Sequence, residues 1–334
     1  MPIKLSEKER EIITCMYFRA DMPLRQVAKE TGLKEHSVRH ALDSLYERGA
    51  LINRPFISPY AVGYCEHQAY FKLITPGENA RKLLSTALKN SAFTTFVGNL
   101  GGEYQIECMF LTRSTSEIQT FFDEVHAAAR GVEFEKTVSN CLSVTLFLPK
   151  GISSRRYSVS SLTYDSATRA NSMDATDLKV LASLAHAKKL FMAQLSRQAG
   201  IPAATFEYRL KSLRRRGAIL AFGLQAVRFN DGLTPYSLFA YGKKLDLRGR
   251  KKLFSYCDLS PHVTYLVELA GACDYEIGLR LKDPCQLNEV VQDLLLNLRT
   301  EISRIESTPV FEVLKLDPFP ACCYESGLAS AATA

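Results

Sequence analysis

The 334-residue sequence lacks the usual marks of a membrane, secreted or metal-binding protein. No apolar run approaches the roughly 20 residues that a bilayer-spanning helix needs. The opening segment MPIKLSEKER is charged and lacks the apolar core of a secretion signal. The nine cysteines form no CxxC pair, so their spacing supports no zinc or iron–sulfur site, and we predict neither a metal nor a cofactor. We therefore expect a cytoplasmic protein with reduced, mostly buried thiols and no membrane contact.

The composition is that of an ordinary globular protein, with 46% hydrophobic and 23% charged residues. At roughly 100–200 residues per domain, the length allows two to four domains. The formal net charge of +7 favours an anionic partner such as nucleic acid, although the distribution of that charge is more informative than its total.

The most informative feature is an internal repeat. Residues 5–51 align without a gap with residues 173–219, and both segments end in the pattern RGA followed by an aliphatic residue. One single-residue shift later, Gly102 aligns with Gly271. The chain therefore consists of two copies of one unit. Residues 151–172 between them are rich in Ser, Arg and Thr, which predicts an exposed linker.

Each copy begins with the pattern of a helix-turn-helix. In the first copy Ser6 and Glu9 form a capping box, and Pro23 can start a second helix. Gly32 provides the turn, and a third helix is predicted over residues 34–48. Three helices at this spacing are typical of a DNA reader whose third helix enters the major groove.

The outward face of each third helix carries the residues that we predict to contact double-stranded DNA. They are His36, Ser37, Arg39, His40 and Asp43 in the first copy, and Thr205, Tyr208, Arg209, Lys211, Arg214 and Arg215 in the second. Polar side chains near the start of such a helix reach base edges, and basic ones further along reach phosphates. The alternative is a face that is merely solvated, but two aligned copies in complete three-helix contexts favour DNA binding.

The two readers differ in charge. Residues 1–54 contain ten Lys and Arg against eight Asp and Glu, whereas residues 173–222 contain nine against three. The densest cluster, residues 214–216, could instead favour the C-terminal dipole of its own helix. Our hypothesis is that the second reader supplies more phosphate affinity and the first more discrimination.

After each reader the pattern changes to βαββαβ, which predicts a ferredoxin-like sheet with helices on one face. The strands are expected at 68–74, 93–100, 104–111 and 134–148, then at 236–241, 263–269, 275–281 and 310–316. The helices are expected at 78–90, 116–129, 247–257 and 285–298. The open face of each sheet needs a cover, for which the sister domain is the obvious candidate.

The predicted fold is therefore α+β, with two winged or tri-helical helix-turn-helix domains alternating with two ferredoxin-like domains. The predicted boundaries are 1–54 for the first reader, 60–150 for the first ferredoxin-like domain, 151–172 for the linker, 173–222 for the second reader, 223–320 for the second ferredoxin-like domain and 321–334 for a flexible tail.

Several segments resemble the Lrp/AsnC transcriptional regulators. They are LSEKEREIITCMY, VAKETGLKEHSVRHALDSLYERGAL and LGGEYQIECMF in the first copy, and DATDLKVLASL, LSRQAGIPAATFEYRLKSLRRRGAIL and LAGACDYEIGLRL in the second. The resemblance implies that the helix-turn-helix binds DNA, and that the ferredoxin-like (RAM) domain self-associates and often binds an amino acid at an interface. Fused halves would form the usual dimer within one chain, as a pseudo-dimer.

The resemblance also implies an effector site at a loop that reads roughly Gly-x-Tyr-Asp-Tyr in the family. The matching residues are Gly102 and Tyr104 in the first copy, and Gly271, Asp274 and Tyr275 in the second. The first copy has lost the Asp. Because a carboxylate suits an α-ammonium group, the second loop is the better candidate for binding an amino acid or other small effector. The alternative is that these residues only shape a tight connection between strands.

We accordingly predict a DNA-binding transcriptional regulator and not an enzyme. The main alternative is a siroheme decarboxylase-like enzyme, because those proteins also resemble Lrp/AsnC regulators and occur as fused copies. The HNY- and YNLWF-like stretches expected of them are absent, and His67 and His262 are expected at the surface. A third alternative is a ligand-binding scaffold with vestigial readers.

Overall fold

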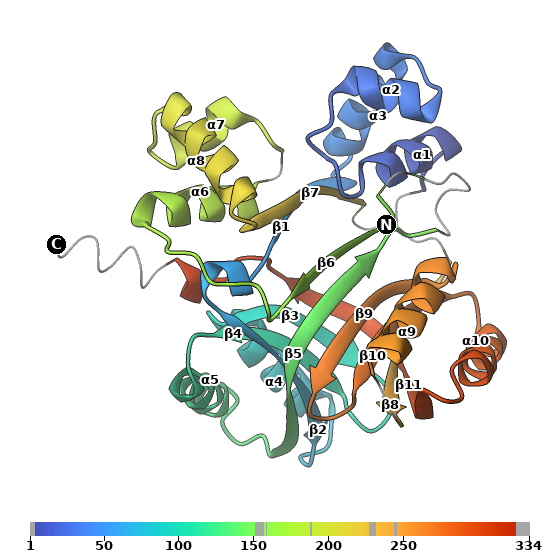
Figure 1. Ribbon diagram of the computed structural model, residues 1–334. Coiled ribbons are helices and arrows are strands. Elements are labelled where there is room, and N and C mark those ends of the chain that lie inside the picture. The colour runs from blue at the N-terminus through green and yellow to red at the C-terminus, as the bar shows by residue number, and fades with distance from the viewer. Residues whose placement is uncertain are drawn as a thin grey trace.

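The computed structural model describes residues 4–150, 157, 159–187, 189–226, 232–243 and 246–324. Two three-helix readers lie on one side of a large β-structure, which carries four further helices on its flanks (Figure 1). The first reader contains α1 (Glu7–Met16), α2 (Leu24–Thr31) and α3 (Glu35–Glu47), and the second contains α6 (Ala175–Ala185), α7 (Met192–Gln198) and α8 (Ala203–Arg215). The predicted α+β class is confirmed.

Local signals explain where the reader helices begin and end. At the start of α1 the Ser6 side chain accepts the Glu9 amide, and the Glu9 carboxylate accepts the Ser6 amide at 2.8 Å, which is the expected capping box. Gly32, with φ of 71°, ends α2 in the left-handed conformation that glycine adopts without penalty. Val38 and Leu45 are fully buried on the inner face of α3, so its polar face is turned outward.

The strands that follow the two readers pair with each other. β1 (Leu51–Ile57) and β7 (Ile219–Ala226) form an antiparallel two-stranded ribbon that lies between the readers and the larger β-structure (Figure 1). Leu224 of β7 packs in the core of the first reader, and Ile57 of β1 packs in the core of the second. Each reader thus rests partly on the strand of its sister.

Both ferredoxin-like units have the predicted βαββαβ order. The first contains β2 (Cys65–Leu73), α4 (Glu78–Asn90), β3 (Thr94–Leu100), β4 (Ile106–Thr112), α5 (Thr115–Ala128) and β5 (Phe134–Phe147). The second contains β8 (Thr234–Gly242), α9 (Leu247–Leu259), β9 (Val263–Ala270), β10 (Tyr275–Leu281), α10 (Pro284–Asn297) and β11 (Ile302–Leu316). One apolar core lies beneath each helix pair, as where Phe110 stacks on Phe121 at 4.1 Å between ring centroids.

The two sheets join because their last strands are long enough to cross from one unit to the other. β5 pairs first with β2 of its own unit and then with β9 of the sister, and β11 pairs first with β8 and then with β3. The strand order β2-β4-β3-β11-β8-β10-β9-β5 closes through the β2–β5 pairing. The result is an eight-stranded antiparallel barrel with its helices outside. Each sheet therefore covers the other, as expected.

Two predictions about irregular segments need correction. Within the predicted linker, β6 (Ser161–Asp165) pairs with the edge of β5, and the Tyr164 hydroxyl donates to Glu66 at 3.1 Å. The linker is therefore partly ordered, because residues 161–165 pair with the second half of β5, with Leu162 and Tyr164 on the same face of the new strand. Residues 151–156 and 158 lie outside the described residues.

The predicted flexible tail at 321–334 also begins too early. η2 (Ala321–Cys323) buries the Cys323 side chain beneath the second reader, and the Tyr64 hydroxyl donates to the Cys322 carbonyl at 2.8 Å. Apolar contact anchors this segment, which the sequence composition alone did not reveal. Residues 325–334 lie outside the described residues.

All nine cysteines fall in the described part of the chain; none is disulfide-bonded, and six are buried, in agreement with the predicted buried thiols. Among the described helices, none combines the length and apolar composition that a bilayer crossing requires.

Candidate nucleic-acid interface and candidate ligand sites

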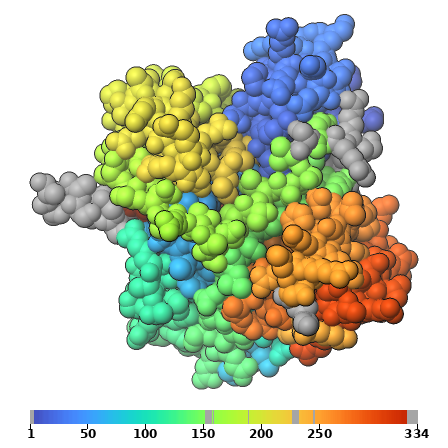
Figure 2. All heavy atoms as spheres, viewed as in Figure 1, coloured from blue at the N-terminus to red at the C-terminus, as the bar shows by residue number. Residues whose placement is uncertain are grey.

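The outer face of α3 is open to solvent. The side chains of His36, Arg39, His40 and Asp43 are exposed, and Ser37 is half-buried. Within the described residues, the ion pair of Arg39 is an exposed one, with Glu35 one turn away, at 3.2 Å. Figure 2 shows the two readers as separate lobes on the same side of the molecule. The predicted first reading face is therefore available to a partner.

The outer face of α8 is open over most of its length. Thr205, Lys211 and Arg215 are exposed, and the Tyr208 side chain is 63% exposed. Arg209 differs, because its guanidinium bonds to Asp174 at 2.6 Å and to Asp177 at 3.3 Å, both at the start of α6. A phosphate contact by Arg209 would have to compete with these two carboxylates.

Arg214 connects the two readers. Its guanidinium forms an ion pair at 2.7 Å with Asp21, in the loop between α1 and α2 of the first reader, and lies 5.5 Å from the ring centre of Phe222. Both charged groups are partly exposed, so the pair contributes only about 0–1 kcal/mol to stability. Arg214 therefore forms a weak bridge between the readers, and Lys211 and Arg215 are the less constrained cations of this face.

The second candidate effector loop is closed against the sister unit. A side chain at Gly271 would meet Ser139 of β5, with a Cβ only 2.7 Å from the Ser139 Cα. Ser139 Oγ accepts the Ala272 amide at 2.8 Å, and the Asp274 carboxylate accepts the Gly242 amide at 2.6 Å. Tyr275 is buried. These residues therefore build the junction between the two halves of the barrel.

The first candidate loop makes the symmetry-related contact. Gly102, with φ of 88°, lies beside Thr308 of β11, and Thr308 donates to the Gly101 carbonyl. The pairs Gly102–Thr308 and Gly271–Ser139 are related by the repeat. Tyr104 is half-buried, with its ring 5.4 Å from that of Tyr70. This geometry favours the interpretation in which the loops shape strand connections, and an effector at either loop stays a prediction.

Inside the barrel lies a polar cluster that sequence reasoning missed. Glu107 and Glu276 are buried and related by the repeat, and the Gln68 side-chain amide donates to both carboxyls. Tyr70 and Tyr265 donate to the Glu276 carboxylate at 2.5 and 2.6 Å. Burial and the neighbouring Glu276 charge raise the pKa of Glu107 well above its usual range. The Glu107 carboxyl is therefore more easily protonated than an exposed glutamate, and it shares the Gln68 amide with Glu276.

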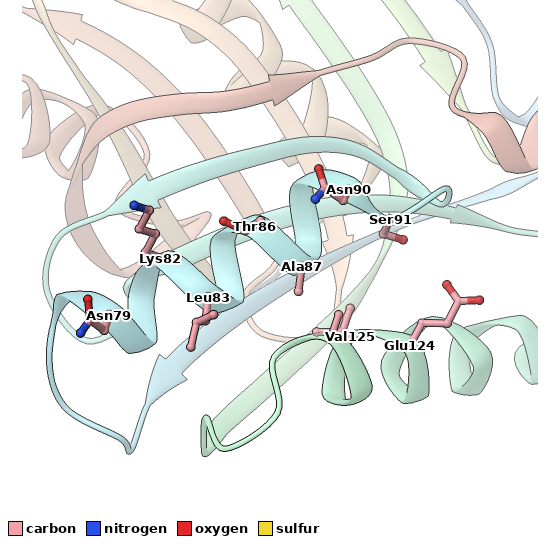
Figure 3. Close-up of a pocket in the computed structure, with 10 residues that line it drawn as sticks. Asn79, Lys82, Leu83, Thr86, Ala87, Asn90, Ser91, Glu124 and Val125 are labelled. Atoms are coloured by element: carbon pink, nitrogen blue, oxygen red, sulfur yellow. The ribbon is translucent and has the colours of Figure 1, made fainter.

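Two hollows accompany these features. The first is a cavity of about 490 Å³ in the barrel lumen, bounded by the β1–β7 ribbon. It is lined mainly by apolar side chains, together with the charged residues Arg54, Arg280, Glu66, Glu107 and Asp317. The second is an open groove between α4 and α5, lined by Leu83 and Ala87 of α4 and by Val125 of α5 (Figure 3). Only the lumen combines enclosure with converging charged groups.

The curated proteins that match this chain in sequence are transcriptional regulators. No family model matches the chain. The HTH-type transcriptional regulator FL11 of Pyrococcus abyssi is 27% identical over 141 residues, which cover 41% of this chain and 90% of that protein. The Pyrococcus horikoshii FL11 regulator is 25% identical over 139 residues, with the same coverage. The resemblance to Lrp/AsnC regulators is confirmed. The match covers nearly all of FL11 but less than half of this chain. FL11 therefore corresponds to a single unit, and the similarity says nothing about the duplication.

A solved structure matches this chain over nearly its full length. The siroheme decarboxylase NirDL, in complex with an iron-uroporphyrin III analogue, aligns with a TM-score of 0.62 over 98% of this chain and 99% of that one, at 10% identity. Such low identity establishes a shared fold and nothing more. The duplicated reader and barrel arrangement is thus a known architecture.

His67, expected at the surface, is buried. Its ring nitrogens lie 2.8 Å from Asn140 Oδ1 and 2.8 Å from Thr112 Oγ1, and its ring packs on Phe110. Burial lowers its pKa, which keeps the imidazole neutral. The expectation was wrong because neighbouring residues of a strand point to opposite faces. Glu66 and Gln68 face the barrel lumen, so His67 between them faces the helices that cover the barrel. Within the described residues, no histidine lines the lumen.

Glu66 should make the stability of this protein fall as pH rises. Its side chain is buried, and burial raises its pKa from 4.5 to about 7. Because the folded state holds the proton more tightly than the unfolded state, the contribution of Glu66 to stability is greatest below pH 4.5 and decreases up to pH 7, by about 3 kcal/mol. Glu66→Gln should remove this part of the pH dependence in urea unfolding at pH 5 and 8. The exposed Glu124→Gln is the control, and equal pH profiles for both variants would contradict the assignment.

Proposed function

We propose that this protein is a sequence-specific DNA-binding transcriptional regulator whose two halves act as an intrachain pseudo-dimer. One observation carries the proposal: α3 and α8 present exposed polar faces from two complete readers that share one β1–β7 ribbon. The similarity to the FL11 regulators supports the same conclusion. A shared ribbon would hold the readers at a fixed separation, which is how dimeric helix-turn-helix proteins select paired half-sites.

The two readers are proposed to recognise different half-sites. The α3 face offers His36, Arg39 and His40, whereas the α8 face offers Tyr208 and Lys211. Since base-edge contacts depend on side-chain identity, these faces favour different base pairs. An amino-acid effector at the Gly271–Tyr275 loop remains part of the proposal. It would have to draw the Asp274 carboxylate away from the Gly242 amide.

Selection of genomic fragments by the purified protein at physiological salt tests this function. We expect enrichment of sites with two dissimilar half-sites, and a shift in binding when the effective amino acid is added. Enriched perfect palindromes would contradict the two-reader arrangement, and failure to enrich any fragment would contradict the regulator itself.

A second candidate function is a tetrapyrrole enzyme of the siroheme decarboxylase kind, and the full-length match to NirDL favours it. A shift in the Soret absorbance of an iron porphyrin on mixing with the protein, without enrichment of DNA, would support the enzyme. Enriched DNA without a porphyrin shift would support the regulator.

A further inference from the structure

The barrel lumen has the size and lining of a small-molecule site. Eight-stranded barrels have an interior just wide enough to hold one small ligand. The cavity of about 490 Å³ lies within the roughly 300–1,000 Å³ typical of such sites. Its strand walls consist mainly of apolar side chains, among them Phe96, Met109, Val144, Leu146, Val267 and Val310. Met109 lies on a central strand yet is only half-buried, because its side chain borders this space. These walls favour a ligand with an apolar body.

The ribbon side of the lumen carries a cation with an unused donor. Arg54 of β1 donates through Nη2 to the Leu316 carbonyl at 2.9 Å, while its Nη1 is buried and meets no hydrogen-bond acceptor in the described part of the chain. Burial lowers the pKa of Arg54 to about 10, opposed by the charges of Asp317 and Tyr17, so the guanidinium stays charged at neutral pH. An unpaired buried donor of this kind is costly, and an incoming carboxylate would satisfy it.

A second cation outweighs the Asp317 carboxylate at that end of the cavity, which lies apart from the acidic cluster. Arg280 lines the lumen and lies four residues beyond Glu276 on the same face of β10, which places their backbones about 13 Å apart. The carboxyls of Glu107 and Glu276 are already engaged with Gln68. An anionic group is therefore attracted to the ribbon end, and the apolar body of the same molecule fits the space towards the cluster.

We propose that the lumen binds an apolar carboxylate, with its carboxylate on Arg54 at the ribbon end and its apolar body between the barrel walls. This site is distinct from the Gly102 and Gly271 loops, and its occupation does not require that the protein bind DNA.

Isothermal titration calorimetry with dodecanoate, below its micelle concentration, tests the site. We expect saturable binding with one dodecanoate per chain, and binding of dodecanol that is about 10- to 100-fold weaker because it lacks the charge. Arg54→Gln should weaken dodecanoate binding by a similar factor and leave dodecanol binding unchanged. Arg304→Gln removes an exposed arginine on β11, which is 60% exposed, and should change neither.

A filled lumen provides the test of location. Met109→Trp places a large ring in the cavity and should abolish binding of both compounds, with an unchanged circular dichroism spectrum showing that the barrel is intact. Dodecanoate binding that survives Met109→Trp, or no binding to the natural chain, would overturn the inference. Binding of uroporphyrin III without dodecanoate would overturn it too and favour the second candidate function. Dodecanoate binding by a protein that selects no DNA would leave this inference standing and remove only the regulator.

Discussion

Replacing Lys211 and Arg215 together with glutamine is expected to lower affinity for DNA on the order of 50-fold at 0.1 M salt. Both side chains are exposed on α8, and the proposed mode of DNA binding gives each of them one phosphate contact. Every phosphate contact releases condensed counterions and adds about 0.9 to the slope of log K against log salt. The double variant should therefore reduce that slope by about 1.8. Fluorescence anisotropy on a selected genomic site, measured from 50 to 200 mM salt, gives both quantities.

The matched control removes the same charge far from the readers. Lys82 and Lys89 are exposed on α4, on the flank of the barrel, so Lys82→Gln with Lys89→Gln should leave the salt slope nearly unchanged. Equal slopes for the two double variants would mean that the basic surface of α8 does not touch the phosphate backbone. In that case the charge asymmetry between the readers would need another explanation.

The sequence predicted the reader helices well because their signals are local. The third helix was expected over residues 34–48 and is found at Glu35–Glu47. The capping box at Ser6 and the left-handed Gly32 fix helix ends through neighbours only a few residues away. Periodic apolar residues then select which face is buried. None of these features depends on how distant parts of the chain are arranged.

Contacts between distant residues could not be predicted in the same way. Strand β11 was expected over 310–316 but begins at Ile302, because residues 302–309 are largely polar and contain a proline, and only pairing with β8 makes them extended. Arg209 and Arg214 were both predicted to contact DNA, yet their carboxylate partners Asp174 and Asp21 lie 35 and 193 residues away. The polar face of a helix shows which side chains point outward, not which of them meet a carboxylate from a distant part of the chain.

The polar cluster in the lumen was missed for a related reason. Glu107 and Glu276 are each the single acid of a mostly apolar strand, a pattern that usually indicates a water-facing position. Closure of the barrel turns that face inward. The available signal was the repeat itself, since the two acids align with the same offset as Gly102 and Gly271. An acid kept at the same strand position in both halves indicates a shared environment.

Replacing Gly271 with alanine is expected to destabilise the protein by about 3–5 kcal/mol. The new Cβ would lie 2.5 Å from Ser139 Oγ and 2.7 Å from its Cα, so strand β5 would have to move at the junction between the halves. Overpacking at such a site costs about 1–3 kcal/mol, and the unfavourable backbone conformation adds a comparable amount. Urea unfolding at constant pH measures the loss.

The loop of the first copy supplies the control, because it measures the cost of the backbone conformation without the close packing. Gly102 also has a positive φ, but among the described residues the one atom within 4 Å of its new Cβ would be Thr308 Oγ1, at 3.7 Å. Gly102→Ala should therefore cost about 1–2 kcal/mol. Ser139→Gly removes two of the three atoms that would crowd a Cβ at residue 271, namely Oγ and Cβ of Ser139. It should therefore partly restore the stability lost in Gly271→Ala, which a double-mutant cycle would record as a favourable coupling energy. Equal losses at Gly102 and Gly271, with no rescue, would show that close packing against β5 is not what requires glycine. In that case packing would not explain the glycine at position 271. An effector site at this loop would then become the leading explanation for Gly271.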